Sequence, residues 1–256
     1  MRVALPAALL RVPIAHRALH DRKAGRVENS AQAMQAAIAA GYGIEMDLQL
    51  SSDGVPMVFH DDTLDRLTSE TGSVRAQTAE TLGQIKLRFS TDTIPTFAQV
   101  LAMVAGRVAL LIEIKDQSLT MSDTDGRLEA ATVAALAEYT GPVALMSFNP
   151  HSVAHLARLA PHLARGLITS AFDPQGWSPL PAATCDSLRG IPDYDRTGAS
   201  FISHAASDLD RPRVAELKAR GAAVLCWTIR SPEAELQART IAQNITFEGY
   251  AAALPA

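Results

Sequence analysis

Short apolar runs alternate with alanine-rich stretches from one end of the chain to the other. The apolar runs have the length of β-strands and lie at residues 12–15, 43–50, 108–114, 143–147, 166–169, 199–203, 223–229 and 244–247. Strands that alternate with helices are typical of parallel βα units, and eight strands are the number that closes a barrel. The pattern therefore predicts an α/β fold of the (β/α)8, or TIM barrel, type.

The stretches between the strands carry helical patterns. Residues 30–40 place Met34 and Ile38 on one stripe, and Gly41 follows as a favourable helix C-terminus. Further helices are predicted at residues 96–105, 128–139, 150–159 and 211–220. Because no internal repeat, low-complexity tract or linker rich in proline and glycine divides the sequence, we expect residues 1–256 to form a single domain.

Polar side chains recur where the predicted strands end. The strand ends read His16-Arg17, Glu45/Asp47, Glu113/Lys115, Ser147, Thr169, His204, Trp227/Thr228 and Glu248. In TIM barrels the chemistry gathers at the C-terminal ends of the strands, where the βα loops meet. A barrel built for stability alone would not need polar residues at nearly every strand end.

Two carboxylates lie in the second strand. Glu45 and Asp47 are two residues apart, so on a strand they share one face, while Ile44 and Met46 point to the other. Paired carboxylates on an apolar strand repel each other and lose hydration, and one hard divalent cation, Mg²⁺ or Ca²⁺, would offset both effects. The alternative is a pair of ordinary surface carboxylates on an edge strand.

A tight turn follows this strand. Asp53-Gly54 separates two β-like runs, so the returning run folds back along residues 43–50 and brings His60 near Glu45. A histidine with a purely structural role is the alternative. In the third strand, Glu113 and Lys115 again share one face. Glu113 would complete the metal site and Lys115 would meet a phosphate oxygen, unless the two form only a buried ion pair.

The first strand ends on His16 and Arg17. A neutral imidazole at a barrel rim exchanges protons near neutral pH, and a guanidinium suits phosphate, although Arg17 alone could be a surface cation. Two later strand ends offer substrate contacts. His204 is predicted to line the pocket, and Trp227 is predicted to pack against a substrate's carbon skeleton, with a core tryptophan as the alternative.

Composition limits the classes of partner. The formal charge of -4 and the absence of a long Lys/Arg run argue against nucleic acid. No run reaches the ~18 apolar residues of a membrane span. Residues 1–11 resemble a weak signal peptide, but Pro6 and Arg11 interrupt the apolar stretch. Since Cys185 and Cys226 lack metal-type spacing, buried, reduced thiols are expected. We therefore expect a soluble, cytoplasmic protein without a membrane anchor. The sequence leaves its oligomeric state open.

Taken together, these motifs resemble the glycerophosphodiester phosphodiesterase family. The matching segments are His16-Arg17, Glu28-Asn29-Ser30, Glu45-x-Asp47, Asp53-Gly54 through His60-Asp61, Leu64-Asp65-Arg66-Leu-Thr68, Gly72, Glu113-x-Lys115, Ser147-Phe148 and Trp227-Thr228. Each segment alone is a weak signal, but in this order the set is specific and extends along most of the chain.

The resemblance implies a role for each matching residue. It implies one divalent cation on Glu45, Asp47 and Glu113, with His16 and His60 as the acid–base pair. Arg17 and Lys115 would hold phosphate oxygens, and Trp227 would line the substrate pocket. The implied fold is a TIM barrel with a hairpin-like insertion after the second strand. The implied substrate is a small glycerophosphodiester, cleaved to glycerol phosphate and an alcohol.

The chain departs from the family pattern in three places. Ala18 stands where a glycine is usual, Glu248 stands where an aspartate is usual, and residues 22–26 hold a basic cluster without an evident role. Two other functions stay open. One is a phosphodiesterase of the same barrel type that acts on lysophospholipid or sphingolipid headgroups. The other is a barrel that binds phosphorylated metabolites without turnover.

Overall fold

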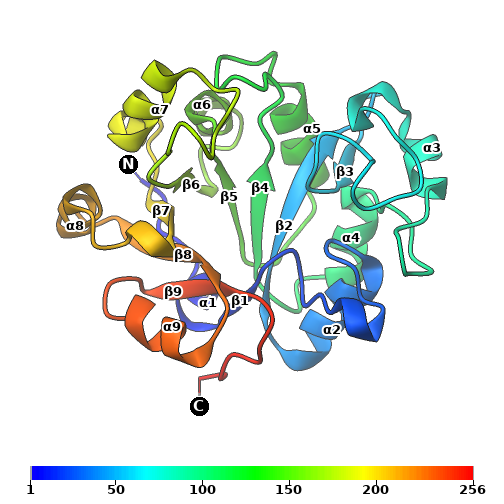
Figure 1. The fold of residues 1–256 in the computed structure, drawn as a ribbon, viewed down its shortest axis with the longest axis horizontal. Helices are drawn as coiled ribbons and strands as arrows, with labels where there is room; N and C mark the ends of the chain where they lie inside the picture. The colour runs from blue at the N-terminus through cyan, green and yellow to red at the C-terminus, as the bar shows by residue number, and fades with distance from the viewer. Residues whose placement is uncertain (1, 256) are drawn as a thin grey trace.

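The computed structural model describes residues 2–255, in which eight parallel strands form a closed ring (Figure 1). The ring consists of β1 (Ile14–Ala15), β2 (Gly43–Leu50), β4 (Leu110–Ile114), β5 (Val143–Ser147), β6 (Ala164–Thr169), β7 (Phe201–Ala205), β8 (Ala223–Ile229) and β9 (Asn244–Phe247). β1 pairs in parallel with both β2 and β9, which closes the ring. The predicted TIM barrel is confirmed, and every predicted strand overlaps an observed one.

Helices surround the barrel. They are α1 (Ala7–Arg11), α2 (Ala31–Ala40), α3 (Ala79–Gln84), α4 (Phe97–Val104), α5 (Arg127–Ala135), α6 (Pro150–Leu159), α7 (Ala182–Arg189), α8 (Pro212–Ala219) and α9 (Pro232–Ala238). Short 3-10 turns lie at Arg22–Ala24, Val74–Ala76, Pro192–Tyr194 and Ala206–Asp208. The five predicted helices correspond to α2, α4, α5, α6 and α8. Helix α2 is capped by Ser30 and ends at Gly41, which has φ +77°.

The two faces of each barrel strand meet different surroundings. On β2, Ile44 and Met46 pack outward in the main core against the helices, whereas Glu45 and Asp47 point into the barrel. The part of the interior near the start of the strands is apolar and includes Leu111 of β4. As a result, the barrel interior is apolar near the start of the strands and polar near their ends.

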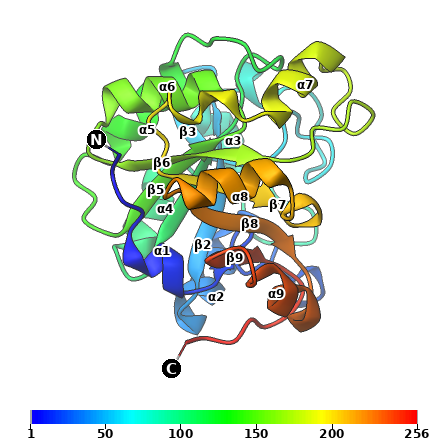
Figure 2. The same ribbon diagram turned by 90° about the vertical axis from the view of Figure 1, so that its left-hand side faces the viewer.

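Helix α1 covers the end of the barrel at which the strands begin. Leu5 and Leu9 are buried in the same apolar cluster as Phe201, which begins β7. The side chain of Asn244, the first residue of β9, donates hydrogen bonds to the carbonyls of Leu9 and Val12 at 2.9 and 2.7 Å. Figure 2 shows α1 beside the barrel strands. The apolar N-terminal residues are therefore part of the barrel core.

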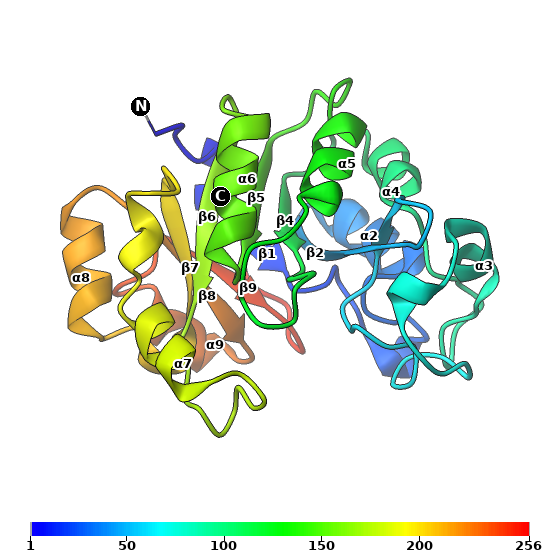
Figure 3. The ribbon, with the colours of Figure 1, turned by 90° about the horizontal axis from the view of Figure 1, so that it is seen from above.

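An insertion follows β2. Strand β3 (Pro56–Val58) runs antiparallel to β2, with Leu48 paired to Val58, after a turn in which Gly54 has φ +86°. The insertion has its own small apolar core, which includes Phe59. Figure 3 shows it at the edge of the molecule opposite α8. The predicted hairpin is confirmed, and it carries His60 to the rim of the barrel.

Two further observations concern the described chain. Cys185 and Cys226 are buried and free, as expected. Between residues 2 and 255, no helix has the length and apolar character needed to cross a bilayer.

Candidate active site

A cavity opens where the barrel strands end. It is lined by His16, Arg17, Glu45, Asp47, His60, Glu113, Lys115, Met146, Phe148, Ile168, Ser203, Trp227 and Thr246. Nine site residues were predicted from the sequence, and eight of them line this cavity. The ninth, His204, does not.

Three buried carboxylates occupy one side of the cavity. Glu45, Asp47 and Glu113 each place an oxygen within 4.8 Å of the other two. Burial, together with the mutual repulsion of the three groups, raises the pKa of Glu45 well above its ordinary value and also raises the pKa of Glu113. Burial would raise the pKa of Asp47 as well, but Lys115 and other nearby cations hold it below its ordinary value.

The buried cation nearest to these carboxylates is Lys115. Its Nζ lies 2.8 Å from Asp47 Oδ1 and 2.8 Å from Glu113 Oε1. Its pKa is raised even though burial alone would lower it, because two carboxylates face it. Burial and the repulsion by Asp47 and Glu113 keep the pKa of Glu45 raised, so Lys115 and Arg17 do not fully offset the clustering of the three carboxylates. Three converging carboxylate oxygens in a buried, over-negative site are the donor set that Mg²⁺ and Ca²⁺ prefer, so the residues fit a divalent cation.

The loop after β1 holds these carboxylates in place. The backbone N–H of Arg17 donates to Glu45 Oε2 at 2.8 Å, and the side-chain amide of Asn29 donates to Asp47 Oδ2 at 2.8 Å. Arg17, Ala18 and Asn29 all have positive φ, at 50°, 66° and 58°. Ala18 therefore adopts the left-handed conformation for which a glycine would be the usual residue.

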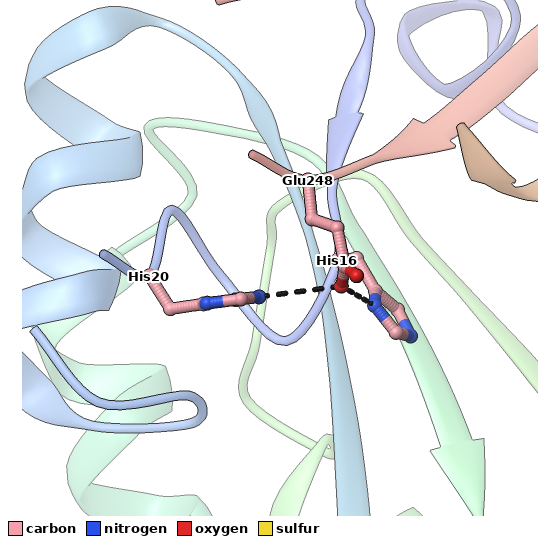
Figure 4. Close-up of side chains that lie close together, drawn as sticks. All are labelled: His16, His20 and Glu248. Carbon is pink, nitrogen blue, oxygen red and sulfur yellow. Dashed lines mark hydrogen bonds and ion pairs between the residues drawn. The ribbon is translucent and has the colours of Figure 1, made fainter. Parts of the chain in front are cut away.

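The ring of His16 contacts the carboxylate of Glu248 through Nδ1 (Figure 4). Its Nδ1 lies 2.6 Å from Glu248 Oε2, and Arg230 donates to the other oxygen of Glu248 at 2.8 Å. Hydrogen bonds from His16 and His20 lower the pKa of Glu248, so this carboxylate is ionised and Nδ1 of His16 is the donor. Burial lowers the pKa of His16 although Glu248 opposes the shift. A neutral ring with its proton on Nδ1 leaves Nε2 as a proton acceptor.

His60 has the same arrangement on the insertion. Its Nδ1 lies 2.6 Å from Asp61 Oδ1, and Arg66 donates to both oxygens of Asp61 at 2.6 and 2.8 Å. Arg66 also donates to Glu28, which accepts a further bond of 2.7 Å from Arg17. Each imidazole at the cavity is therefore oriented by a carboxylate that an arginine holds in turn.

Aromatic rings form another wall of the cavity. Trp227 donates through Nε1 to the carbonyl of Ser203 at 3.0 Å and meets Phe148 edge to face, with ring centroids 5.5 Å apart. Phe148 also contacts Trp177, with centroids 5.0 Å apart. Trp227 is only partly buried, which leaves ring surface available to a ligand.

The prediction that His204 lines the pocket was wrong. Along β7 the interior side chains are Phe201 and Ser203, so His204 points outward and is fully buried. Its ring nitrogens contact Thr169 Oγ1 at 2.8 Å and the carbonyl of Asp208 at 3.1 Å. Several lining residues were not nominated as site residues, namely Met146, Phe148, Ile168, Ser203 and Thr246. Their side chains are apolar or small, so they have no charged or titratable group that would have identified them as site residues in the sequence.

Comparison with known proteins agrees with the family resemblance of the sequence motifs. The model of the glycerophosphoryl diester phosphodiesterase family matches residues 16–246. A glycerophosphodiester phosphodiesterase from Caldanaerobacter subterraneus is 33% identical over 151 residues, which are 55% of this chain and 60% of the relative. The aligned segment thus spans about three fifths of that protein.

Solved structures share the fold over nearly the whole chain. A phosphodiesterase from Oleispira antarctica, solved with the product sn-glycerol-3-phosphate, is 25% identical with a TM-score of 0.75, and 93% of each chain is covered. A glycerophosphodiester phosphodiesterase from Parabacteroides distasonis is 20% identical with a TM-score of 0.72, and it covers 93% of this chain and 92% of its own. At that identity, the second likeness supports the fold alone.

Proposed function

Because the chain belongs to the glycerophosphoryl diester phosphodiesterase family, we propose that it hydrolyses glycerophosphodiesters to glycerol phosphate and an alcohol. One observation carries the proposal. Three buried carboxylates line one cavity together with two imidazoles, each of which contacts a further carboxylate. The cavity lies at the C-terminal ends of the strands, where TIM-barrel enzymes carry out their chemistry. The product bound to the Oleispira antarctica protein, sn-glycerol-3-phosphate, is the kind of molecule this reaction releases.

In this proposal, Glu45, Asp47 and Glu113 hold one divalent cation, Mg²⁺ or Ca²⁺. The cation supplies charge neutralisation at the phosphate and at the developing transition state. The fit rests on the oxygen-only donor set and on the raised pKa values of Glu45 and Glu113, which a bound cation would return toward ordinary values.

Arg17 and Lys115 bind the phosphate oxygens. Among the described residues, the buried Nε of Arg17 has no hydrogen-bond partner and lies 3.7 Å from Asp47 Oδ2, so it retains a donor for a ligand. Lys115 Nζ lies beside the carboxylates, where it can contact a phosphate. Trp227 and Phe148 offer apolar surface to the carbon skeleton of the substrate.

His16 and His60 act as the acid–base pair. With Nδ1 engaged by a carboxylate, each ring exchanges protons through Nε2. One imidazole removes the proton from the attacking oxygen, and the other protonates the departing alkoxide. A hydroxyl of the glycerol attacks first to give a cyclic phosphate, which water then opens.

The first test is a release assay with glycerophosphocholine and glycerophosphoethanolamine, each with and without EDTA. We expect turnover that EDTA abolishes and that excess Mg²⁺ or Ca²⁺ restores. Turnover confined to lysophospholipid or sphingolipid substrates would contradict the proposed substrate class. Binding without turnover would contradict the proposed reaction.

Cation binding has its own test. At a concentration about 100 times its Kd, a cation should add about 2.7 kcal/mol to the free energy of unfolding. The variant Glu45→Gln should lose this increase. It should not destabilise the cation-free protein, because it removes a buried, repelled charge while an amide oxygen can still accept from Arg17. Urea unfolding with and without cation measures both effects, and cation stabilisation that persists in the variant would place the ion elsewhere.

A further inference from the structure

A second group of metal-ligating side chains lies beside the catalytic cavity. His16 directly follows β1, His20 lies in the loop after it, and Glu248 follows β9. Each offers one ligand atom within 4.8 Å of the other two. Figure 4 shows the two imidazoles directed at the same carboxylate, whose Oε2 lies 2.6 Å from His16 Nδ1 and 3.4 Å from His20 Nε2.

We propose that His16, His20 and Glu248 form a second, inhibitory metal site that takes Zn²⁺. Two imidazoles and one carboxylate, with a position left for water, are a donor set that zinc prefers. The three carboxylates in the catalytic cavity offer oxygen alone and suit a hard cation. The two sites therefore differ in the type of metal they select.

The cluster is reachable by an ion from a separate groove. A cavity of about 840 Å³ is lined by His20 and Glu248 and by none of the three carboxylates. The side chains of His16, His20 and Glu248 are 15%, 22% and 19% exposed, so no large movement is needed to admit water and an ion. The groove supplies space for the water ligand.

The charges around the cluster set its affinity. Arg230 donates to Oε1 of Glu248, which leaves Oε2 directed at the two imidazoles for a metal. The groove is also lined by the basic cluster Arg22, Lys23 and Arg26. These cations repel Zn²⁺, so the affinity of the site for zinc is lower than that of a site surrounded by neutral groups. The occupancy of the site therefore depends on the zinc concentration.

Zinc at this position changes what His16 can do. Without the metal, Nδ1 lies 2.6 Å from the Glu248 carboxylate, a contact that requires the ring proton on Nδ1 and leaves the lone pair of the neutral ring on Nε2. When Nδ1 binds zinc, the ring proton moves to Nε2, so Nε2 no longer accepts a proton. Metal binding and proton uptake by His16 exclude each other. This consequence rests on the proposed acid–base role of His16, whereas the metal site itself does not.

Calorimetric titration with Zn²⁺ tests the site without reference to activity. In a Glu45→Gln background, which weakens the carboxylate site, we expect one equivalent of Zn²⁺ to bind. Adding His20→Ala should abolish this binding. Adding His155→Ala should leave it intact, since His155 contacts Asp123 at 3.0 Å outside the cluster. Zinc binding that survives His20→Ala would overturn the proposal.

The release assay then tests inhibition. With saturating Mg²⁺, Zn²⁺ should lower the wild-type rate by about 100-fold at saturation, as expected when an acid–base group is removed. The His20→Ala variant, compared with its own zinc-free rate, should be far less sensitive. Equal inhibition of both proteins would overturn the inhibitory role. If zinc binds through His20 without slowing the wild type, the metal site stands and the acid–base role of His16 is contradicted.

Discussion

The two imidazoles of the cavity are oriented by the same device. Glu248 and Asp61 each accept from Nδ1 of a histidine and are each held by an arginine. A carboxylate behind an imidazole fixes the ring orientation and the tautomer, and it stabilises the charged ring when a proton arrives. Both histidines are therefore prepared to exchange protons through Nε2.

This arrangement predicts the effect of removing either ring. His16→Ala and His60→Ala should each lower kcat by about 10²–10⁴, since acid–base catalysis contributes that much. The fold should persist, because both side chains are partly exposed and lie at the rim. The comparison is with His162→Ala, which removes an exposed histidine distant in sequence. Steady-state kinetics and far-UV circular dichroism measure the two effects, and full activity of either variant would refute its assigned role.

The face of a strand on which a residue lies could be predicted where polar and apolar residues alternate along that strand. Glu45 and Asp47 alternate with apolar residues on β2, so period two alone predicted that they share one face, which in the structure is the interior face. On β7 this contrast is missing, because Phe201 and Ile202 are both apolar and buried although they face opposite sides. The sequence therefore gave no basis for deciding that Ser203 points inward and His204 outward. The catalytic and binding roles of the eight residues in the cavity remain predictions.

At the scale of elements, length explains three of the four helices that were not predicted from the sequence, α7 being the fourth. The eight strands were predicted because each is a short run rich in apolar residues that lies between helical stretches. Helices α1, α3 and α9 have five, six and seven residues, too few for a helical stripe to repeat. Helix α9 nevertheless begins with Ser231 as N-cap and Pro232 in the first turn, a signal that the sequence contains.

Helix α1 provides a stability prediction at this scale. Leu9 is fully buried in the lower barrel, so Leu9→Ala should reduce the free energy of unfolding by about 2–5 kcal/mol. The matched change Leu236→Ala, at a side chain that is 74% exposed, should stay within about 0.5 kcal/mol. Urea denaturation of the three proteins measures both values. If Leu9→Ala costs no more than Leu236→Ala, α1 does not stabilise the barrel.

At the scale of the whole molecule, the site depends on ring closure. His16 and Glu248 are 232 residues apart and meet because β1 pairs with β9. His60 arrives from the insertion, which Arg66 and Glu28 connect to the loop after β1. Local patterns predict each part, but the contact between Glu248 and His16 exists only in the closed barrel.

The connection through Glu28 should make this assembly sensitive to acid. Glu28 is mostly buried, and its hydrogen bonds to Arg66 and Arg17 outweigh that burial and lower its pKa from 4.5 to about 2. A carboxylate with a depressed folded-state pKa contributes stability above its unfolded pKa and loses it as the pH falls through the folded value. Here the contribution is about 3 kcal/mol at neutral pH and declines between about pH 4.5 and 2.

The variant Glu28→Gln isolates this contribution. The difference in the free energy of unfolding between wild type and variant should be largest near neutral pH and should shrink as the pH falls below about 4.5. Glu138→Gln, which changes an exposed glutamate, should give a small difference with little pH dependence. Urea unfolding of all three proteins across this pH range measures these differences. A wild-type advantage over Glu28→Gln that stays constant with pH would mean that the arginines do not depend on the charge of Glu28, and that packing alone joins the insertion to the barrel.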